Sequence, residues 1–142
     1  MFNNTLQLIE YAAFFGSIQI FQYLKFNNVE IKPSIWLYAI HGNNYELIHL
    51  LEEDGIISNE QSFFEKCYDE SIKCFNSELA QYIHDKYLFE KDEEFFFCKM
   101  IENYNFIDLP SEIKVDFNTF CNFCKYNYFD IVDFLVKNSF EF

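Results

Sequence analysis

Two cysteines near the end of the chain, Cys121 and Cys124, have the C-x-x-C spacing of zinc ligands or of a redox-active dithiol. A zinc site of this kind needs a second pair of ligands, and none of the three histidines stands at ligand spacing from these cysteines. A redox dithiol needs a thioredoxin-like alternation of strands and helices, which the sequence lacks. We therefore expect Cys121 and Cys124 to pack in the core, and we predict no metal ion and no cofactor.

A second group that could do chemistry consists of Cys67, Cys74 and His84. The two cysteines are seven residues apart on one predicted helix and therefore share a face. A nucleophilic cysteine needs a histidine partner and an increased thiolate fraction, and no feature of the sequence selects His84 for that role. We predict that the chain is not an enzyme, with a cysteine-dependent site at these three residues as the alternative.

Carboxylates form two runs, at residues 52–54 and 92–94. Paired acids serve in general acid–base catalysis when a cleft separates their pKa values. Here both runs fall at predicted helix ends, where residues 92–94 suit a helix N-terminus and residues 52–54 do not suit a C-terminus. We expect both runs to form solvated faces.

The composition limits the classes of partner. The chain has 142 residues and a formal net charge of −13, and all ten basic residues are lysine. Phosphate backbones and anionic membranes need a basic face, so we expect neither nucleic acid nor a membrane as partner. The N-terminus lacks the basic start of a signal peptide, and the five cysteines are irregularly spaced. We predict a cytoplasmic protein of one domain, 1–142.

A pattern of apolar residues at i, i+3 and i+4 recurs four times, which places each triplet on one helix face. The triplets are Ile20/Tyr23/Leu24, Leu47/Leu50/Leu51, Leu79/Tyr82/Ile83 and Ile131/Phe134/Leu135. Seven residues before each triplet stands a small or medium apolar residue: Ala13, Ile40, Ile72 or Cys124. The spacing predicts a repeated pair of helices with the triplet in the core.

Four residues before each triplet, the sequence predicts a tight turn. Gly16, Asn43 and Asn127 occupy this position, and Gly and Asn tolerate the left-handed backbone of a helix end. Phe75 is the exception, with Asn76 after it. In the second copy a glycine, Gly42, comes one residue early. Each unit thus reads as helix, turn, helix.

We expect an all-α chain of roughly five units and almost no strand. The units are 5–28, 33–55, 60–87, an irregular 88–111 broken at Pro110, and 112–138. The expected helices are 5–14, 17–26, 34–41, 44–54, 60–74, 77–87, 92–103, 112–126 and 128–137.

The stretch "AAFFGSIQIFQYLKFNN" resembles the A-A-x-x-G-x-x-x-[IV]-x-x-L-L core of an ankyrin repeat, through Ala12, Ala13, Gly16 and the first triplet. The whole chain is similar to the divergent, Phe/Tyr/Asn-rich ankyrin-like proteins expanded in some unicellular parasites, with the poorest match at 88–117. The ankyrin T-P-L-H turn and most of the projecting hairpin fingers are missing. The resemblance implies a solenoid of about four to five stacked repeats that binds a protein partner and has no catalytic residue.

We therefore predict a protein-binding or scaffold module. The candidate contact residues lie just before the turns and are Phe14, Phe15, His41, Lys73, Lys125 and Tyr126. Phe14 and Phe15 also suit a packing role, in which they cover a neighbouring repeat. Besides the cysteine-dependent enzyme, a third possibility is a structural segment of a longer repeat array, whose uncapped apolar ends would permit self-association.

Overall fold

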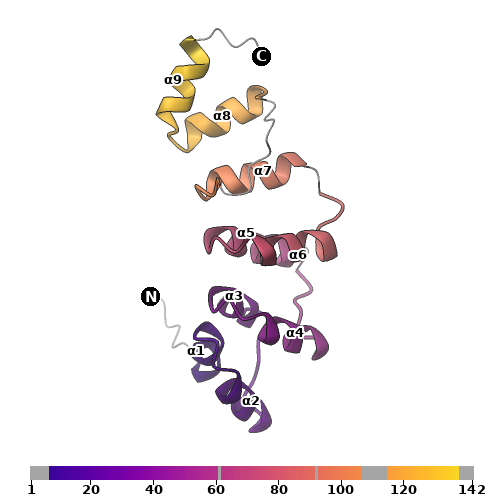
Figure 1. Ribbon diagram of the computed structural model, residues 1–142. Helices are drawn as coiled ribbons and strands as arrows, with labels where there is room; N and C mark the ends of the chain where they lie inside the picture. Colours follow the sequence, from indigo (N-terminus) through magenta and orange to yellow (C-terminus); the bar gives the residue numbers. More distant parts are fainter. Residues whose placement is uncertain (1–6, 61, 92, 107–114, 138–142) are drawn as a thin grey trace, which may run out of the picture. The chain divides into compact units, whose positions relative to one another are not determined.

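The computed structural model describes residues 7–60, 62–91, 93–106 and 115–137 (Figure 1). Within these ranges the chain forms nine α-helices and no strand, which confirms the all-α class. The helices are α1 (Leu8–Phe14), α2 (Ile18–Phe26), α3 (Ile35–His41), α4 (Tyr45–Glu53), α5 (Phe63–Lys73), α6 (Ser77–Tyr87), α7 (Glu93–Glu102), α8 (Phe117–Lys125) and α9 (Phe129–Lys137). The predicted break at Pro110 lies outside the described residues.

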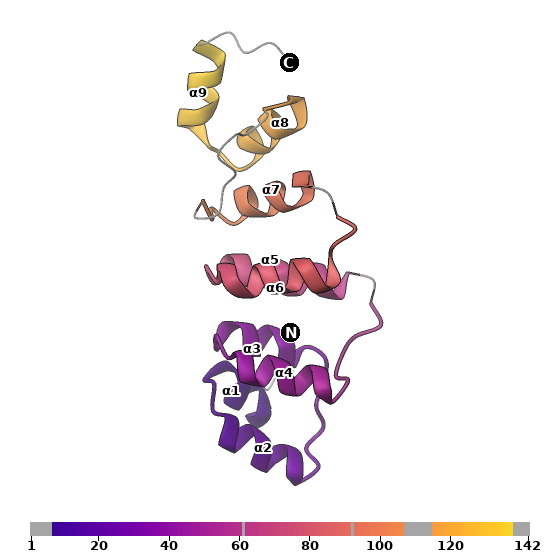
Figure 2. The same ribbon diagram turned by 45° about the vertical axis from the view of Figure 1, so that its right-hand side comes forward.

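The chain divides into two compact units, residues 1–88 and 89–142. The first, called unit 1, holds three helical hairpins, α1/α2, α3/α4 and α5/α6, and the first helices of successive hairpins pack against each other (Figures 1 and 2). The second, called unit 2, holds α7 and the hairpin α8/α9. The assignment of residues 1–142 to a single domain stays a prediction.

The predicted turns are present in all four hairpins. The φ angles of Gly16, Asn43, Phe75 and Asn127 are 64°, 47°, 55° and 60°, so every one of these residues is left-handed, Phe75 included. In each turn the left-handed residue donates its N–H to the carbonyl three residues back, and the next residue donates to the carbonyl five back. This is the Schellman arrangement that ends many helices, and here it repeats at one position of the pattern.

Gly42 precedes the left-handed residue and has an ordinary helical φ of −70°. A Cβ at Gly42 would lie 2.6 Å from the Ala13 carbonyl oxygen and 2.8 Å from that of Phe14. The glycine therefore permits close approach of α3 to the end of α1. The early glycine of the second copy is explained by packing, and the turn itself stays in register at Asn43.

The core of unit 1 follows the pattern in the second and third hairpins, where Leu47, Leu51, Leu79 and Ile83 are buried. In the first hairpin the prediction is wrong, because Ile20 and Tyr23 are 51% and 67% exposed. Phe21 is the fully buried residue of α2, and among the described residues no helix covers the face with Ile20 and Tyr23.

Trp36 fills the space between the second and third hairpins. Its ring is fully buried and meets the rings of Phe63, Phe64 and Tyr87 edge-on, at centroid distances of 5.9, 5.7 and 6.4 Å. Its indole N–H donates to the carbonyl oxygen of Ile56 at 2.6 Å. Burial of an aromatic ring of this size with its polar atom satisfied is a large source of stability.

Unit 2 has a core around Ile101, Phe123 and Leu135, but Phe134 of the fourth triplet is 62% exposed, so the prediction is wrong at that residue. Cys121 and Cys124 are exposed, so the prediction that they pack in the core is wrong. The matching positions Ala13 and Ile40 are fully buried in unit 1, where neighbouring first helices pack together. No described helix of unit 2 covers Cys124 in that way, and Phe123 takes the buried place.

Candidate functional site

Side chains from three successive hairpins of unit 1 meet where α1, α3 and α5 end. The Phe14 ring lies 5.1 Å from the Phe15 ring and 5.4 Å from the His41 ring, centroid to centroid. On the other side of His41, its Nδ1 lies 3.3 Å from the Cys74 Sγ. We call Phe14, Phe15, His41, Lys73 and Cys74 the hairpin-end row. It brings together four of the six predicted contact residues.

These residues meet because they occupy one place in the repeated hairpin. Each stands within two residues before a left-handed turn residue, and α1 packs on α3 as α3 packs on α5. A repeated turn on stacked helices therefore brings side chains about 30 positions apart in the sequence into contact.

His41 lies between a thiol and a carboxylate. Its Nε2 is 2.5 Å from Glu70 Oε1, while its Nδ1 faces Cys74. Glu70 and Cys74 stand four residues apart at the end of α5, on one helix face. Lys73 donates to Asp69 at 2.6 Å and lies 3.6 Å from Glu70. No sequence pattern indicated Glu70, because its partner His41 belongs to another hairpin.

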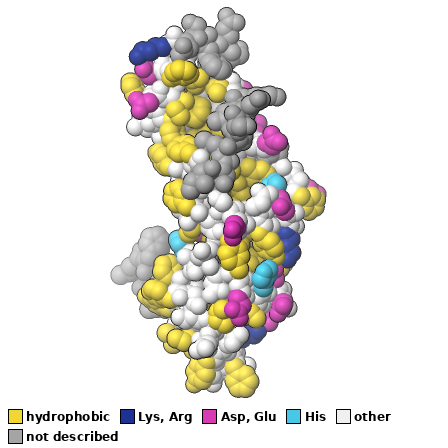
Figure 3. Space-filling view, in the orientation of Figure 1, with side chains coloured by type: hydrophobic (Ala, Val, Ile, Leu, Met, Phe, Trp, Pro, Cys, Tyr) yellow, Lys and Arg dark blue, Asp and Glu magenta, His cyan; other side chains and the backbone are white. Residues whose placement is uncertain are grey.

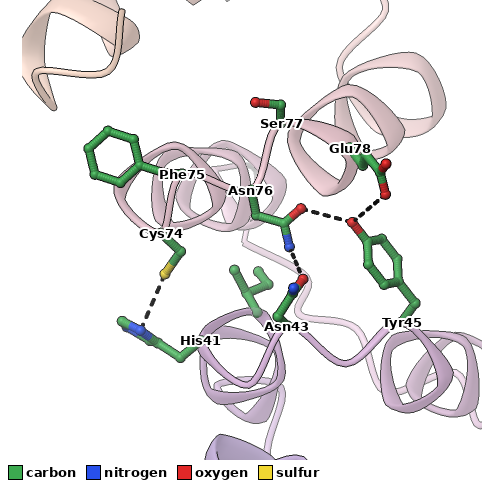
Figure 4. A pocket seen from close by; sticks show the side chains of 9 residues that line it. His41, Asn43, Tyr45, Cys74, Phe75, Asn76, Ser77 and Glu78 are labelled. Atoms are coloured by element: carbon green, nitrogen blue, oxygen red, sulfur yellow. Dashed lines mark hydrogen bonds between the residues drawn. The ribbon is translucent and has the colours of Figure 1, made fainter. Parts of the chain in front are cut away.

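His41 and Cys74 are among the residues that line a pocket of about 360 Å³ between the second and third hairpins. Figure 4 shows a chain of hydrogen bonds along it. The Asn76 amide nitrogen donates to Asn43 Oδ1 at 2.5 Å, and the Tyr45 hydroxyl donates to Asn76 Oδ1 at 2.8 Å and contacts Glu78 at 3.3 Å. The Phe75 ring points away from these groups.

In unit 1, an asparagine links the second hairpin to the first and another links the third hairpin to the second. Asn44 caps α4 by accepting from the Leu47 N–H, and its amide nitrogen donates to the Gly16 carbonyl at 3.1 Å. Asn76 caps α6 in the same way and reaches the turn of the second hairpin. The capping preference of Asn was a usable signal, but the link to the preceding turn was not visible in the sequence.

The cysteine site suggested by the sequence is assembled differently in the structure. Cys74 faces His41, whereas His84 Nδ1 lies 2.6 Å from Asp85 Oδ1. Burial raises the pKa of the Cys67 thiol to about 12. Burial, with the charge of Glu70, also raises the pKa of the Cys74 thiol. Both shifts work against a thiolate nucleophile at neutral pH.

Glu52 is not part of a solvated face, contrary to the prediction. Its carboxylate accepts from the hydroxyls of Tyr82 at 2.8 Å and Tyr87 at 2.5 Å and lies 3.1 Å from the Lys86 ammonium. Burial alone would raise the pKa of Glu52, but these hydrogen bonds, with one from His49, outweigh it and lower the pKa. The group ties α4 to α6. Glu93 and Glu94, in contrast, are exposed in the first turn of α7 as predicted, and Asp92 lies outside the described residues.

Lys125 and Tyr126 hold the matching place in unit 2. The Lys125 ammonium lies 2.7 Å from the Tyr126 hydroxyl and 4.6 Å from the centroid of its ring. The Tyr126 carbonyl accepts from the Tyr104 hydroxyl at 3.0 Å. This turn carries a cation and an aromatic ring but no cysteine–histidine pair, since the described histidines all belong to unit 1.

Exposed apolar side chains lie among acidic ones on the visible face of the molecule (Figure 3). Phe15 is 70% exposed and Phe75 is 54% exposed. Within the described ranges, no helix combines the length and the apolar character that crossing a membrane requires. Comparisons with models of protein families, with curated proteins and with solved structures found no match.

Proposed function

We propose that unit 1 is a stack of ankyrin-like helix–turn–helix repeats that binds a protein partner through the hairpin-end row. The observation that carries the proposal is the meeting of Phe14, His41 and Cys74 from three successive hairpins, beside the exposed ring of Phe15. The repeated Schellman turns and asparagine links support the stacked arrangement.

The chemistry of the row indicates the kind of partner. Aromatic side chains supply much of the binding energy in protein interfaces, and Phe15 and Phe75 offer exposed rings. The chain is strongly acidic, so its field attracts a basic partner. We propose a partner surface with apolar side chains flanked by lysine or arginine, and no enzymatic activity for this chain.

We also propose that the protein is cytoplasmic. All five cysteines lie in the described ranges and are free thiols. Free thiols are ordinary in a reducing compartment and uncommon in secreted proteins.

Partner capture from cells tests this function. Phe15→Ser should remove the partner, whereas Phe129→Ser in unit 2, where Phe129 is 71% exposed against 70% for Phe15, should retain it. Both side chains are exposed, so neither change should unfold the protein. An unchanged set of partners with Phe15→Ser would contradict the proposed surface.

A second function, a segment of a longer array or a self-associating chain, is favoured by the open face of α2. Ile20, Tyr23 and Phe26 are 51%, 67% and 87% exposed on this short helix. Sedimentation over a range of concentrations tests it. Association that is lost in Phe26→Ser supports self-association through this face, and a monomer at every concentration contradicts self-association.

A further inference from the structure

We propose that His41, Glu70 and Cys74 bind one divalent transition-metal ion, for which Zn²⁺ is the best match. Each residue offers one ligand atom, and the three atoms lie within 4.8 Å of one another. Imidazole nitrogen, carboxylate oxygen and thiolate sulfur are the three ligand types that zinc accepts in proteins. The proposal goes beyond protein binding and is independent of it.

The helices bring the ligands to one side of a common point. Glu70 and Cys74 are separated by one helical turn at the end of α5, which is also the spacing of the two histidines in H-E-x-x-H zinc sites. His41 is the last residue of α3 and approaches from the preceding hairpin. Zinc therefore would join the second and third hairpins.

The existing contacts require only a local adjustment. Bonds from zinc to these ligand types are about 2.0–2.3 Å long. At present the imidazole touches the thiol with Nδ1 and the carboxylate with Nε2, whereas a metal ion takes one of the two nitrogens. The His41 side chain is 40% exposed, so its ring is able to turn without disturbing the core.

The local charge favours a cation. Both α3 and α5 end here, and helix C-termini carry partial negative charge. Glu70 adds a full negative charge, and Asp69 lies on the same last turns of α5. Lys73 opposes the cation, but its closest contact is with Asp69. The same surroundings disfavour an anionic nucleophile, which is why we assign metal binding to this cluster and not thiol catalysis.

Hard cations match the cluster less well, because Mg²⁺ and Ca²⁺ select oxygen ligands and two of the three ligands are sulfur and nitrogen. On binding, the Cys74 thiol releases its proton to solvent and zinc bonds the thiolate. Three protein ligands leave the fourth tetrahedral position to water.

Sequence spacing missed this site for a clear reason. His41 and Cys74 are 33 residues apart, in two copies of the repeat. Motif spacing detects ligands within one local segment, whereas this cluster depends on how two hairpins pack.

Cobalt is the direct probe, since a cobalt–thiolate bond gives a near-ultraviolet charge-transfer band. The reduced full chain is titrated with Co²⁺ and then with Zn²⁺. We expect one equivalent of Co²⁺ to produce the band and Zn²⁺ to remove it. The double variant C121S/C124S controls for the two exposed thiols of unit 2 and should keep the band, whereas Cys74→Ser should lose it. Absence of the band in the wild type, or its persistence in Cys74→Ser, would overturn the proposal.

A second measurement separates ligation from folding. Zn²⁺ affinity, from competition with a chromophoric chelator, should fall about tenfold or more in His41→Gln and in Glu70→Gln, with circular dichroism unchanged. The matched variant Glu78→Gln changes a carboxylate beside the same pocket and should keep its affinity. Equal affinity in all three variants would also overturn the site. Neither experiment needs a partner protein, so failure here leaves the proposed function standing and the reverse is also true.

Discussion

The turns of unit 1 and the turn of unit 2 share a backbone but differ in chemistry. Phe75 and Asn127 adopt nearly the same left-handed φ and the same pair of hydrogen bonds. Directly before the first lies Cys74 against His41, and directly before the second lies Tyr126, whose hydroxyl contacts Lys125. The repeated pattern thus sets the path of the chain, and the residues beside it decide what each turn does.

The two units also differ in the residues of their cores. In unit 1 the largest fully buried side chain is Trp36, whereas the core of unit 2 contains Phe123 and its neighbours. Substitutions in one core therefore test whether the two units lose stability separately.

The largest effect should come from Trp36→Ala, which removes the ring that joins the second and third hairpins. We expect unit 1 to lose about 3–5 kcal/mol of stability. Hydrogen exchange should show lost protection in α3 to α6 and little change in α8 and α9. Phe123→Ala should give the reverse pattern. Equal loss across both units would show that they unfold as one.

Gly42→Ala tests the close packing of the first two hairpins, which the turn of unit 2 does not share. The added Cβ would meet backbone oxygens at 2.6 and 2.8 Å, so α3 must shift away from α1 at a cost of about 2–3 kcal/mol. Gly55→Ala is the control, because it meets nothing within 4 Å and adds only left-handed strain of about 1 kcal/mol. Denaturant unfolding measures both. A smaller loss in Gly42→Ala than in Gly55→Ala would refute the packing argument.

Glu52→Gln should weaken the tie between α4 and α6 by about 1–2 kcal/mol near neutral pH, because the carboxylate accepts several hydrogen bonds. The folded state lowers the pKa of Glu52 below 4.5, so its stabilisation is complete above pH 4.5 and is lost as the pH falls through the folded value. The difference in unfolding free energy between wild type and Glu52→Gln, measured with urea, should therefore decrease at acid pH. The control variant Glu53→Gln, at the exposed neighbouring residue, should unfold with the same free energy as the wild type. A difference between wild type and Glu52→Gln that stays constant with pH would contradict the role given to the Glu52 carboxylate.

The sequence predicted the helices and the four turns because these depend on local spacing. Phe75 was the exception in the predicted pattern of turn residues, but Phe75 too is left-handed, since the register of the repeat outweighs the residue's own preference. The predicted burial of the first triplet was wrong, because a side chain is buried only where a neighbouring element covers it. Among the described residues no helix covers the face with Ile20 and Tyr23.

The candidate site was predictable only in part. Phe14 and His41 were predicted as contact residues because they stand just before a turn, and in the structure their rings lie close together. Glu70 and the contact of His41 with Cys74 depend on packing between hairpins, which no short motif records. For the same reason the sequence indicated a surface charge at Glu52, because its two tyrosine partners lie 30 and 35 residues away.

The smallest effect should come from Phe75→Gly. Glycine relieves the left-handed strain, so the chain should gain about 1 kcal/mol in unfolding free energy. The ring is 54% exposed and little packing is lost. Asn127→Gly, at the matching turn of unit 2, should gain less because Asn already tolerates this backbone. If the exposed ring serves binding, partner capture should weaken as stability rises, and a destabilised variant would show that the ring packs.

We propose that successive hairpins of unit 1 stack in register, so that Phe14, His41 and Cys74 meet. Nuclear Overhauser effects in the isotope-labelled full chain test it most directly. We predict cross-peaks between the rings of Phe14 and His41 and between His41 and the Cys74 side chain, with those between Trp36 and Phe63 as the control for a folded core. If the Trp36–Phe63 cross-peaks are present but both the Phe14–His41 and the His41–Cys74 cross-peaks are absent, the hairpins do not stack in this register.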